Sequence, residues 1–145
     1  MKANLMQEPI SFLPLCQRFR DKEMTIWLVD DDNVTNMLNR YFLEEHYPGL
    51  TIRSFIYPTK AMEALFSGLD TPNFILLDIN MPGMSGWEFL DKLQADFNAD
   101  FPMPEIYMLS SSLDPLDEAK ARASVLVNGF ISKPLEVDKL SFLSN

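Results

Sequence analysis

The stretch Met24-Thr25-Ile26-Trp27-Leu28-Val29-Asp30-Asp31-Asp32 sets the architecture expected for this chain. A nearly continuous apolar run is followed at once by three aspartates. A run without polar alternation is typical of a strand that is buried on both faces, as in a parallel sheet covered by helices. The sequence therefore predicts a buried strand over residues 24–29, with carboxylates at its carboxyl end.

The same pattern of an apolar strand and a helical stretch repeats toward the C-terminus. Further strands are predicted over residues 50–55, 74–77, 106–109 and 127–131. Asp32 is expected to cap the first helix, Ser85 and Glu88 to form a capping box at the start of the third, and Asp114-Pro115 to open the fourth. The alternation predicts an α/β fold, with a doubly wound, five-stranded parallel sheet and five helices, (βα)5.

Apolar residues recur at helical spacing between the strands, which indicates amphipathic helices. The first helix carries Val34, Met37, Leu38, Tyr41 and Phe42, and the second carries Ala61, Met62, Leu65, Phe66 and Leu69. The last helix is short and is predicted over residues 135–143.

The composition restricts the class of protein. The chain has 145 residues, 47% hydrophobic and 23% charged, and a net charge of -9, which argues against direct binding of nucleic acid. Its single cysteine, Cys16, can form no internal disulfide and is read as a small hydrophobe. No apolar run has the length of a membrane span, and the N-terminus is a poor signal peptide, so we expect a cytoplasmic protein.

Two parts of the chain differ in their regularity. Residues 1–23 have no clean period and contain Pro9 and Pro14, so they are read as an N-terminal extension. Residues 24–145 carry the regular pattern and have the length of one domain.

Chemically active side chains follow four of the five predicted strands. Asp30 and Asp31 follow the first strand, Asp78 the third, Ser110 the fourth and Lys133 the fifth. Ligands of parallel α/β sheets bind at the carboxyl ends of the strands, near the point where the strand order reverses. We therefore expect these five side chains to meet at one edge of the sheet.

This set of side chains suits phosphoryl transfer to an aspartate. Carboxylates crowded at one edge repel one another, and Mg2+ relieves the repulsion while leaving positions for phosphate oxygens. The neighbours Asp30 and Asp31 are better read as a metal pair, whereas Asp78 stands alone and is the candidate nucleophile. Lys133 and Ser110 offer a charge and a hydroxyl to phosphoryl oxygens.

At this point the sequence resembles the receiver domains of two-component response regulators, and in particular single-domain receivers of the chemotaxis-regulator type. Four segments carry the resemblance: Leu28-Val29-Asp30-Asp31-Asp32, Leu76-Leu77-Asp78-Ile79-Asn80-Met81-Pro82-Gly83-Met84-Ser85-Gly86, Met108-Leu109-Ser110-Ser111 and Gly129-Phe130-Ile131-Ser132-Lys133-Pro134. The resemblance implies a flavodoxin-like sheet with the strand order 2-1-3-4-5.

The resemblance also implies roles for individual residues. Asp78 would accept a phosphoryl group from a sensor histidine kinase or a histidine phosphotransfer protein. Mg2+ would be held by Asp78, directly by Asp31, largely through water by Asp30, and by the backbone carbonyl of Asn80. Lys133 would pair with the phosphate. Ser110 would move to the phosphoryl group while Phe130 turns inward as the switch aromatic.

Signal output would then pass to a protein partner through the face formed by the fourth helix, the fifth strand and the last helix. The protein would be a phosphoacceptor that takes part in its own phosphorylation and autodephosphorylation rather than an enzyme. We expect a monomer or weak dimer, with no nucleic acid or membrane as partner. The chain departs from the family pattern in the short last helix, the long loop over residues 96–104, the extension 1–23, and Phe130 in place of the commoner tyrosine.

Two other functions fit part of this sequence. A receiver-like adaptor that works without phosphorylation usually lacks an acid or the lysine, and this chain has both. A haloacid-dehalogenase-type phosphatase would fit Asp30-Asp31-Asp32-Asn33-Val34, but it needs a further acidic pair after Lys133. In this chain the acids after the lysine, Glu136 and Asp138, belong to the last predicted helix, and Asp78 is left unexplained.

Overall fold

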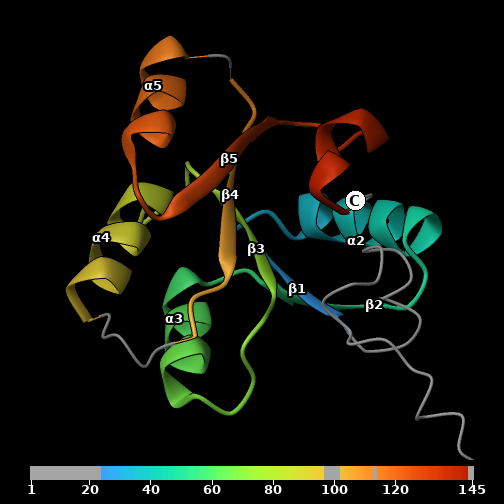
Figure 1. Cartoon of the computed structure of the whole chain (residues 1–145), viewed down its shortest axis with the longest axis horizontal. Helices are drawn as coiled ribbons and strands as arrows, with labels where there is room; N and C mark the ends of the chain where they lie inside the picture. Colours follow the sequence, from blue (N-terminus) through green and yellow to red (C-terminus); the bar gives the residue numbers. More distant parts are fainter. Residues whose placement is uncertain (1–23, 97–101, 113, 144–145) are drawn as a thin grey trace, which may run out of the picture.

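The computed structural model describes residues 24–96, 102–112 and 114–143, and within them five strands form one parallel sheet. The strands are β1 (Met24–Val29), β2 (Leu50–Phe55), β3 (Phe74–Asp78), β4 (Glu105–Ser110) and β5 (Val127–Ser132). Their order is β2-β1-β3-β4-β5, which confirms the expected topology (Figure 1). The extension 1–23 with Cys16, and residues 97–101 of the loop that the sequence marks as long, lie outside the described residues.

Helices cover both faces of the sheet. They are α2 (Asn33–His46), α3 (Pro58–Ser67), α4 (Gly86–Asp96), α5 (Pro115–Ala123) and the 3₁₀ helix η3 (Val137–Leu143). In Figure 1, α3, α4 and α5 lie on one side of the sheet, and α2 and η3 lie on the other. The chain crosses from one face to the other after β2, so the strand order reverses between β1 and β3.

The two apolar cores follow from the period of the strands. Trp27, Val29, Ile75 and Leu77 pack toward α3, α4 and α5, whereas the residues between them pack toward α2 and η3. All of β3 is buried, which explains its continuous apolar sequence. Among the described residues, none of the helices is long and apolar enough to cross a membrane.

The helix starts agree with the sequence signals. The Asp32 carboxylate accepts hydrogen bonds from the amides of Val34 and Thr35 at the start of α2. Ser85 and Glu88 bond each other's amides at 3.1 and 2.9 Å, as a capping box requires. Asp114 caps α5 through the amide of Leu116.

The apolar stripe of α2 faces solvent rather than the sheet. Val34, Met37, Leu38 and Tyr41 are all more than 60% exposed. The helix instead buries Asn36, Asn39 and Leu43. The Asn36 amide donates to the backbone carbonyls of Asp30 (2.9 Å) and Phe55 (3.2 Å), at the ends of β1 and β2. The Phe55 carbonyl also accepts the Asp30 amide, so Asn36 adds a second donor there and joins the ends of β1 and β2. Because these bonds place Asn36 against the sheet, the apolar stripe faces outward.

Two details of the later helices differ from the sequence expectation. Helix α3 ends at Gly68, which has the left-handed φ of 72°, so Leu69 lies beyond the helix and is 91% exposed. The last helix is a 3₁₀ helix with a kink at Leu140 rather than an α-helix. Leu140 and Leu143 are both buried, and their spacing of three residues matches one turn of a 3₁₀ helix.

Candidate functional site

Three carboxylates gather at the carboxyl ends of the two central strands. Oxygens of Asp30, Asp31 and Asp78 all lie within 4.8 Å of one another. Asp30 and Asp78 are buried, whereas Asp31 is exposed. The cluster therefore has two carboxylates fixed inside the protein and one that faces the solvent, at the point where the strand order reverses.

The backbone at each strand end is held by hydrogen bonds that continue the sheet. The amide of Asp30 donates to Phe55 at 3.0 Å, and that of Ile79, next to Asp78, donates to Leu109 at 3.0 Å. The amide of Lys133 donates to the carbonyl of Ser110 at 2.8 Å. Because the ladder extends past the strands, the sheet itself sets the separation of the site residues.

The close packing of α4 on the end of β3 requires a glycine at the position of Gly86. A Cβ atom at this position would lie 2.6 Å from the carbonyl oxygen of Asp78 and 3.1 Å from the Cα of Ile79. The Gly86 amide donates to the carbonyl of Ile79 at 2.8 Å. The start of α4 thus packs directly on the backbone of Asp78, which only glycine permits.

Lys133 connects the buried carboxylates. Its ammonium lies 2.7 Å from an oxygen of Asp30 and 3.1 Å from an oxygen of Asp78. The other oxygen of Asp30 accepts the amide of Asp32 at 2.9 Å. One cation therefore neutralises part of a cluster that carries three negative charges when fully ionised.

The electrostatics of the cluster appear in the pKa values. Burial, and then the charge of Asp30, raise the pKa of Asp78 to about 6, against the opposing effect of Lys133. For Lys133, burial would lower the pKa, but the hydrogen bond to Asp30 and the charges of both carboxylates raise it above its ordinary value. Lys133 therefore stays charged, whereas Asp78 holds a carboxylate that is poorly stabilised without a further cation.

The remaining residues that the sequence singled out lie around this cluster. Ser110 is fully buried at the end of β4, and its hydroxyl donates to the carbonyl of Ser112 (2.8 Å) and accepts from its amide (3.1 Å). Asn80 is exposed on the loop after β3. Phe130 is half-buried and lines a cavity of about 380 Å³ between β5 and α5. Ser110 thus ends β4, the strand beside β3, and Phe130 lies on the edge strand β5.

The sequence interpretation missed two residues that shape this edge. Asn36 holds the carbonyl of Asp30, and Lys139 contacts the loop after β5. Neither side chain directly follows a strand, so a search restricted to the carboxyl ends of the strands does not identify them. The polar Asn36 within an apolar helix pattern was the available signal.

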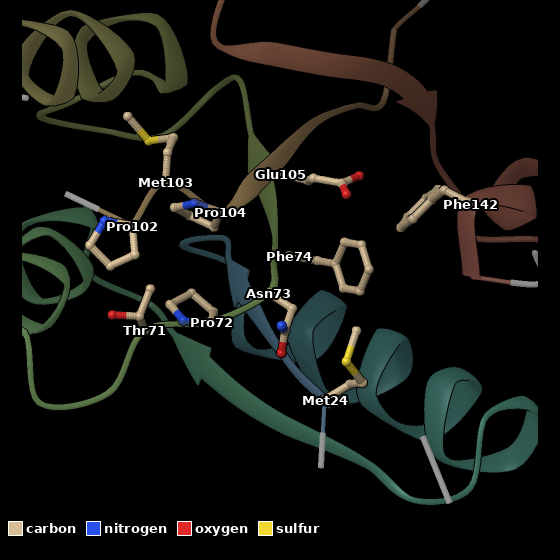
Figure 2. Close-up of a pocket in the computed structure, with 10 residues that line it drawn as sticks. All are labelled: Met24, Thr71, Pro72, Asn73, Phe74, Pro102, Met103, Pro104, Glu105 and Phe142. Atoms are coloured by element: carbon tan, nitrogen blue, oxygen red, sulfur yellow. The ribbon is translucent and has the colours of Figure 1, made fainter. Parts of the chain in front are cut away.

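A cavity of about 520 Å³ lies away from this site. It is lined by the first residues of β1, β3 and β4, Met24, Phe74 and Glu105, and by Phe142 (Figure 2). Its position at the amino ends of the strands separates it from the carboxylates by the length of the sheet. The carboxylate of Glu105 accepts a hydrogen bond from the Tyr107 hydroxyl at 2.7 Å.

The fold and the acidic strand ends define a doubly wound α/β domain with a carboxylate site at its topological switch point. Residues 26–142 match the response regulator receiver domain. The chain belongs to this family.

Individual relatives agree with this assignment. The DNA-binding transcriptional regulator NtrC of Escherichia coli is 31% identical over 116 residues, which cover 79% of this chain but 22% of that protein. A two-component response regulator from Cytophaga hutchinsonii has a solved structure with a TM-score of 0.74 and 36% identity, covering 83% of this chain and 92% of that one. A response regulator of Thermotoga maritima, solved in complex with Mg2+ and BeF, is 22% identical, with a TM-score of 0.61 and coverage of 82% and 94%, and shows likeness of fold.

Proposed function

We propose that this protein is a response regulator that accepts a phosphoryl group on Asp78. The donor is a phosphohistidine of a sensor histidine kinase or a phosphotransfer protein. The bond between nitrogen and phosphorus breaks as a carboxylate oxygen of Asp78 bonds to phosphorus, and the imidazole regains a proton. One observation carries the proposal: Asp78 shares a site with two further carboxylates, and Lys133 lies 3.1 Å from it.

The oxygen-rich cluster fits Mg2+. Magnesium prefers carboxylate and carbonyl oxygens and retains waters that phosphate oxygens can replace. Asp78 and Asp31 would bind the ion directly, Asp30 largely through water, and the backbone carbonyl of Asn80 would complete the protein ligands. When bound, the ion supplies positive charge to the transferring phosphoryl group. The Mg2+ in the related Thermotoga maritima structure supports this assignment.

Mg2+ binding should weaken in mild acid. The folded-state pKa of Asp78 is about 6, so this carboxyl takes up a proton as the pH falls through that value and then competes with the metal. We expect the dissociation constant to rise about tenfold from pH 7 to pH 5, because roughly one in ten Asp78 side chains remains ionised at pH 5. Isothermal titration calorimetry at both values measures this change. An equal affinity at pH 7 and pH 5 would contradict the assignment of Asp78 as a ligand.

Ser110, Lys133 and Phe130 would carry the response to phosphorylation. Lys133 already contacts Asp78 and would pair with the phosphate. To reach a phosphoryl oxygen, the Ser110 hydroxyl must leave its two bonds to Ser112, in the segment that leads to α5. Phe130 would turn inward as this segment moves. The change is a shift between two populated states, biased by new charge.

The surface beside the site supports a protein as phosphodonor. The exposed apolar residues of α2 begin at Val34, three positions after Asp31, and continue through Met37, Leu38 and Tyr41. A run of this kind at helical spacing suits an apolar helix of a partner laid across the edge of the site. Output would pass to a second protein through α5, β5 and η3.

We further propose a receiver over residues 24–145 with an extension over 1–23, acting in the cytoplasm as a phosphoacceptor with autodephosphorylation and not as an enzyme on other substrates. The two rival functions are not favoured. An adaptor without phosphorylation has no need for Lys133 between two buried carboxylates. A phosphatase would need an acidic pair after Lys133. In this chain Glu136 pairs with Lys139, and Asp138 is exposed on η3.

Binding of fluoroberyllate, a mimic of the phosphoryl group, tests the proposed site without any chemical step. We expect fluorine NMR to show a bound signal that requires Mg2+ and disappears in Asp78→Ala. The fluorescence of Trp87 should change on binding, because its indole donates to Asp117 of α5 at 3.2 Å. No bound signal for the wild type with Mg2+ present would argue for the adaptor function.

A further inference from the structure

We propose that Lys139 is a positioning residue that holds the loop carrying Lys133. The inference rests on the proposed function, because it concerns how the lysine beside the phosphoacceptor is kept in place. Lys139 belongs to η3 and lies outside the acidic cluster. It acts on the backbone on both sides of Lys133, and we expect no contact between Lys139 and the phosphoryl group.

The contacts of Lys139 bracket Lys133. Its ammonium donates to the carbonyl of Ser132 at 3.0 Å and to that of Pro134 at 3.1 Å. These are the carbonyls of the residues directly before and after Lys133. Glu136 lies 3.1 Å from the same ammonium and completes its charged partners. The side chain of Lys139 is 26% exposed, so the bonds are partly shielded from water.

The peptide group between Ser132 and Lys133 is thereby held at both ends. Its N–H, which belongs to Lys133, donates to the carbonyl of Ser110 on β4 at 2.8 Å. Its C=O, which belongs to Ser132, points away from β4 toward the open edge of the sheet, because the two groups of a trans peptide point in opposite directions. No further strand pairs with β5 on that side in the described sheet. Lys139 supplies the donor that a neighbouring strand would otherwise provide.

This arrangement matters for Lys133 because a long side chain transmits the position of its backbone to its ammonium. Lys133 reaches from the edge strand to Asp30 and Asp78, which follow the two central strands. A loop that moves would displace the ammonium from both carboxylates. Holding the peptide group before Lys133 and the carbonyl after it fixes the starting point of that side chain.

The test compares Lys139→Met with Lys139→Arg and with Lys60→Met as a matched control. Lys60 also forms an ion pair with a glutamate three residues away, Glu63 at 3.6 Å, but it lies on α3, on the opposite face of the sheet. Lys60→Met therefore removes one positive charge and one ion pair with a glutamate, as Lys139→Met does. Each protein is incubated with Mg2+ and acetyl phosphate, and the rate of phosphoryl incorporation is followed by intact mass.

We expect Lys139→Met to slow incorporation about tenfold, less than the roughly hundredfold loss that a displacement of ~1 Å can cause. Lys139→Arg should restore the rate to within about twofold, since arginine keeps the donors. The dissociation constant of Mg2+ should not rise, because the carboxylates are untouched and a displaced Lys133 ammonium competes less with the ion. A general loss of structure would weaken Mg2+ binding as well. A wild-type rate in Lys139→Met would overturn the proposal.

Amide hydrogen exchange of Lys133 gives a second measurement that needs no phosphorylation. In Lys139→Met this amide should exchange at least about tenfold faster than in the wild type and in Lys60→Met. An unchanged exchange rate of this amide in Lys139→Met would overturn the proposal that Lys139 holds the loop. If the wild type accepted no phosphoryl group, the proposed function would fail, and this exchange rate would still decide whether Lys139 holds the loop.

Discussion

Replacing Lys133 with methionine is expected to slow phosphorylation of Asp78 by about a hundredfold or more, the usual loss when a group that stabilises developing charge is removed. The ammonium of Lys133 is the cation next to Asp78, at 3.1 Å. Methionine keeps the length and packing of the side chain but removes its charge. The rate measured by intact mass with acetyl phosphate tests this expectation directly.

The same substitution should also destabilise the metal-free protein by about 3 kcal/mol, since it leaves Asp30 and Asp78 buried without their cation. Urea denaturation in EDTA measures this loss. Mg2+ should recover part of it, because the ion supplies the missing positive charge. Lys92→Met, a substitution on the exposed side of α4, is the matched control and should leave both quantities unchanged. Equal phosphorylation rates for Lys133→Met and Lys92→Met would show that Lys133 does not assist phosphoryl transfer.

Asp78→Asn is expected to have opposite effects on function and on stability. It removes the nucleophile, so phosphoryl incorporation should be lost completely. In EDTA at neutral pH, however, the variant should be more stable than the wild type by about 1 to 2 kcal/mol, because the raised pKa means that the folded state disfavours the charged carboxylate. The midpoint of urea denaturation should therefore rise.

The difference in stability between Asp78→Asn and the wild type should depend on pH. Above pH 6 the wild-type Asp78 is ionised in both the folded and the unfolded state, and the gain in Asp78→Asn is complete. As the pH falls from about 6 toward 3.8, the folded wild type takes up its proton first, and the difference shrinks to nothing. Mg2+ should stabilise the wild type and have much less effect on the variant. The control Asp138→Asn changes an exposed carboxylate. A variant less stable than the wild type in EDTA would contradict the account.

The sheet and the acidic cluster could be predicted from the sequence because short, continuous segments of the chain carry the patterns that indicate them. Met24–Val29 and Phe74–Leu77 are continuous apolar runs, and a strand buried on both faces needs such a run. Once the strands were placed, the rule of carboxyl ends brought Asp30, Asp31 and Asp78 together without any knowledge of distances. Asp32 and Ser85 were correctly predicted as helix caps for the same local reason.

The orientation of α2 could not be predicted from periodicity. Its apolar residues have the spacing of a packed face, but the buried face is set by Asn36, which bonds carbonyls of β1 and β2. These partners are 6 and 19 residues away, and the two carbonyls come together only once the strands are formed. The exposed stripe that results is the surface that we assign to the phosphodonor.

Lys139 and the last helix were missed for a related reason. The spacing of Leu140 and Leu143 suits an α-helix as well as a 3₁₀ helix, so the sequence pattern cannot separate the two, and the backbone of the structure shows the 3₁₀ form with its kink at Leu140. The bonds of Lys139 go to backbone carbonyls, which leave no trace in the sequence. Contacts of side chains with the backbone of another segment are therefore the part of this site that only the structure supplies.

The role of Asp78 as a magnesium-dependent phosphoacceptor is tested most directly by intact mass after incubation with acetyl phosphate and Mg2+. The wild type should gain the mass of one phosphoryl group, the gain should vanish in EDTA, and Asp78→Asn should show none. Asp138→Asn should behave as the wild type. An equal gain in Asp78→Asn would place the acceptor elsewhere. No gain in the wild type, together with no binding of fluoroberyllate, would contradict phosphorylation of this site altogether.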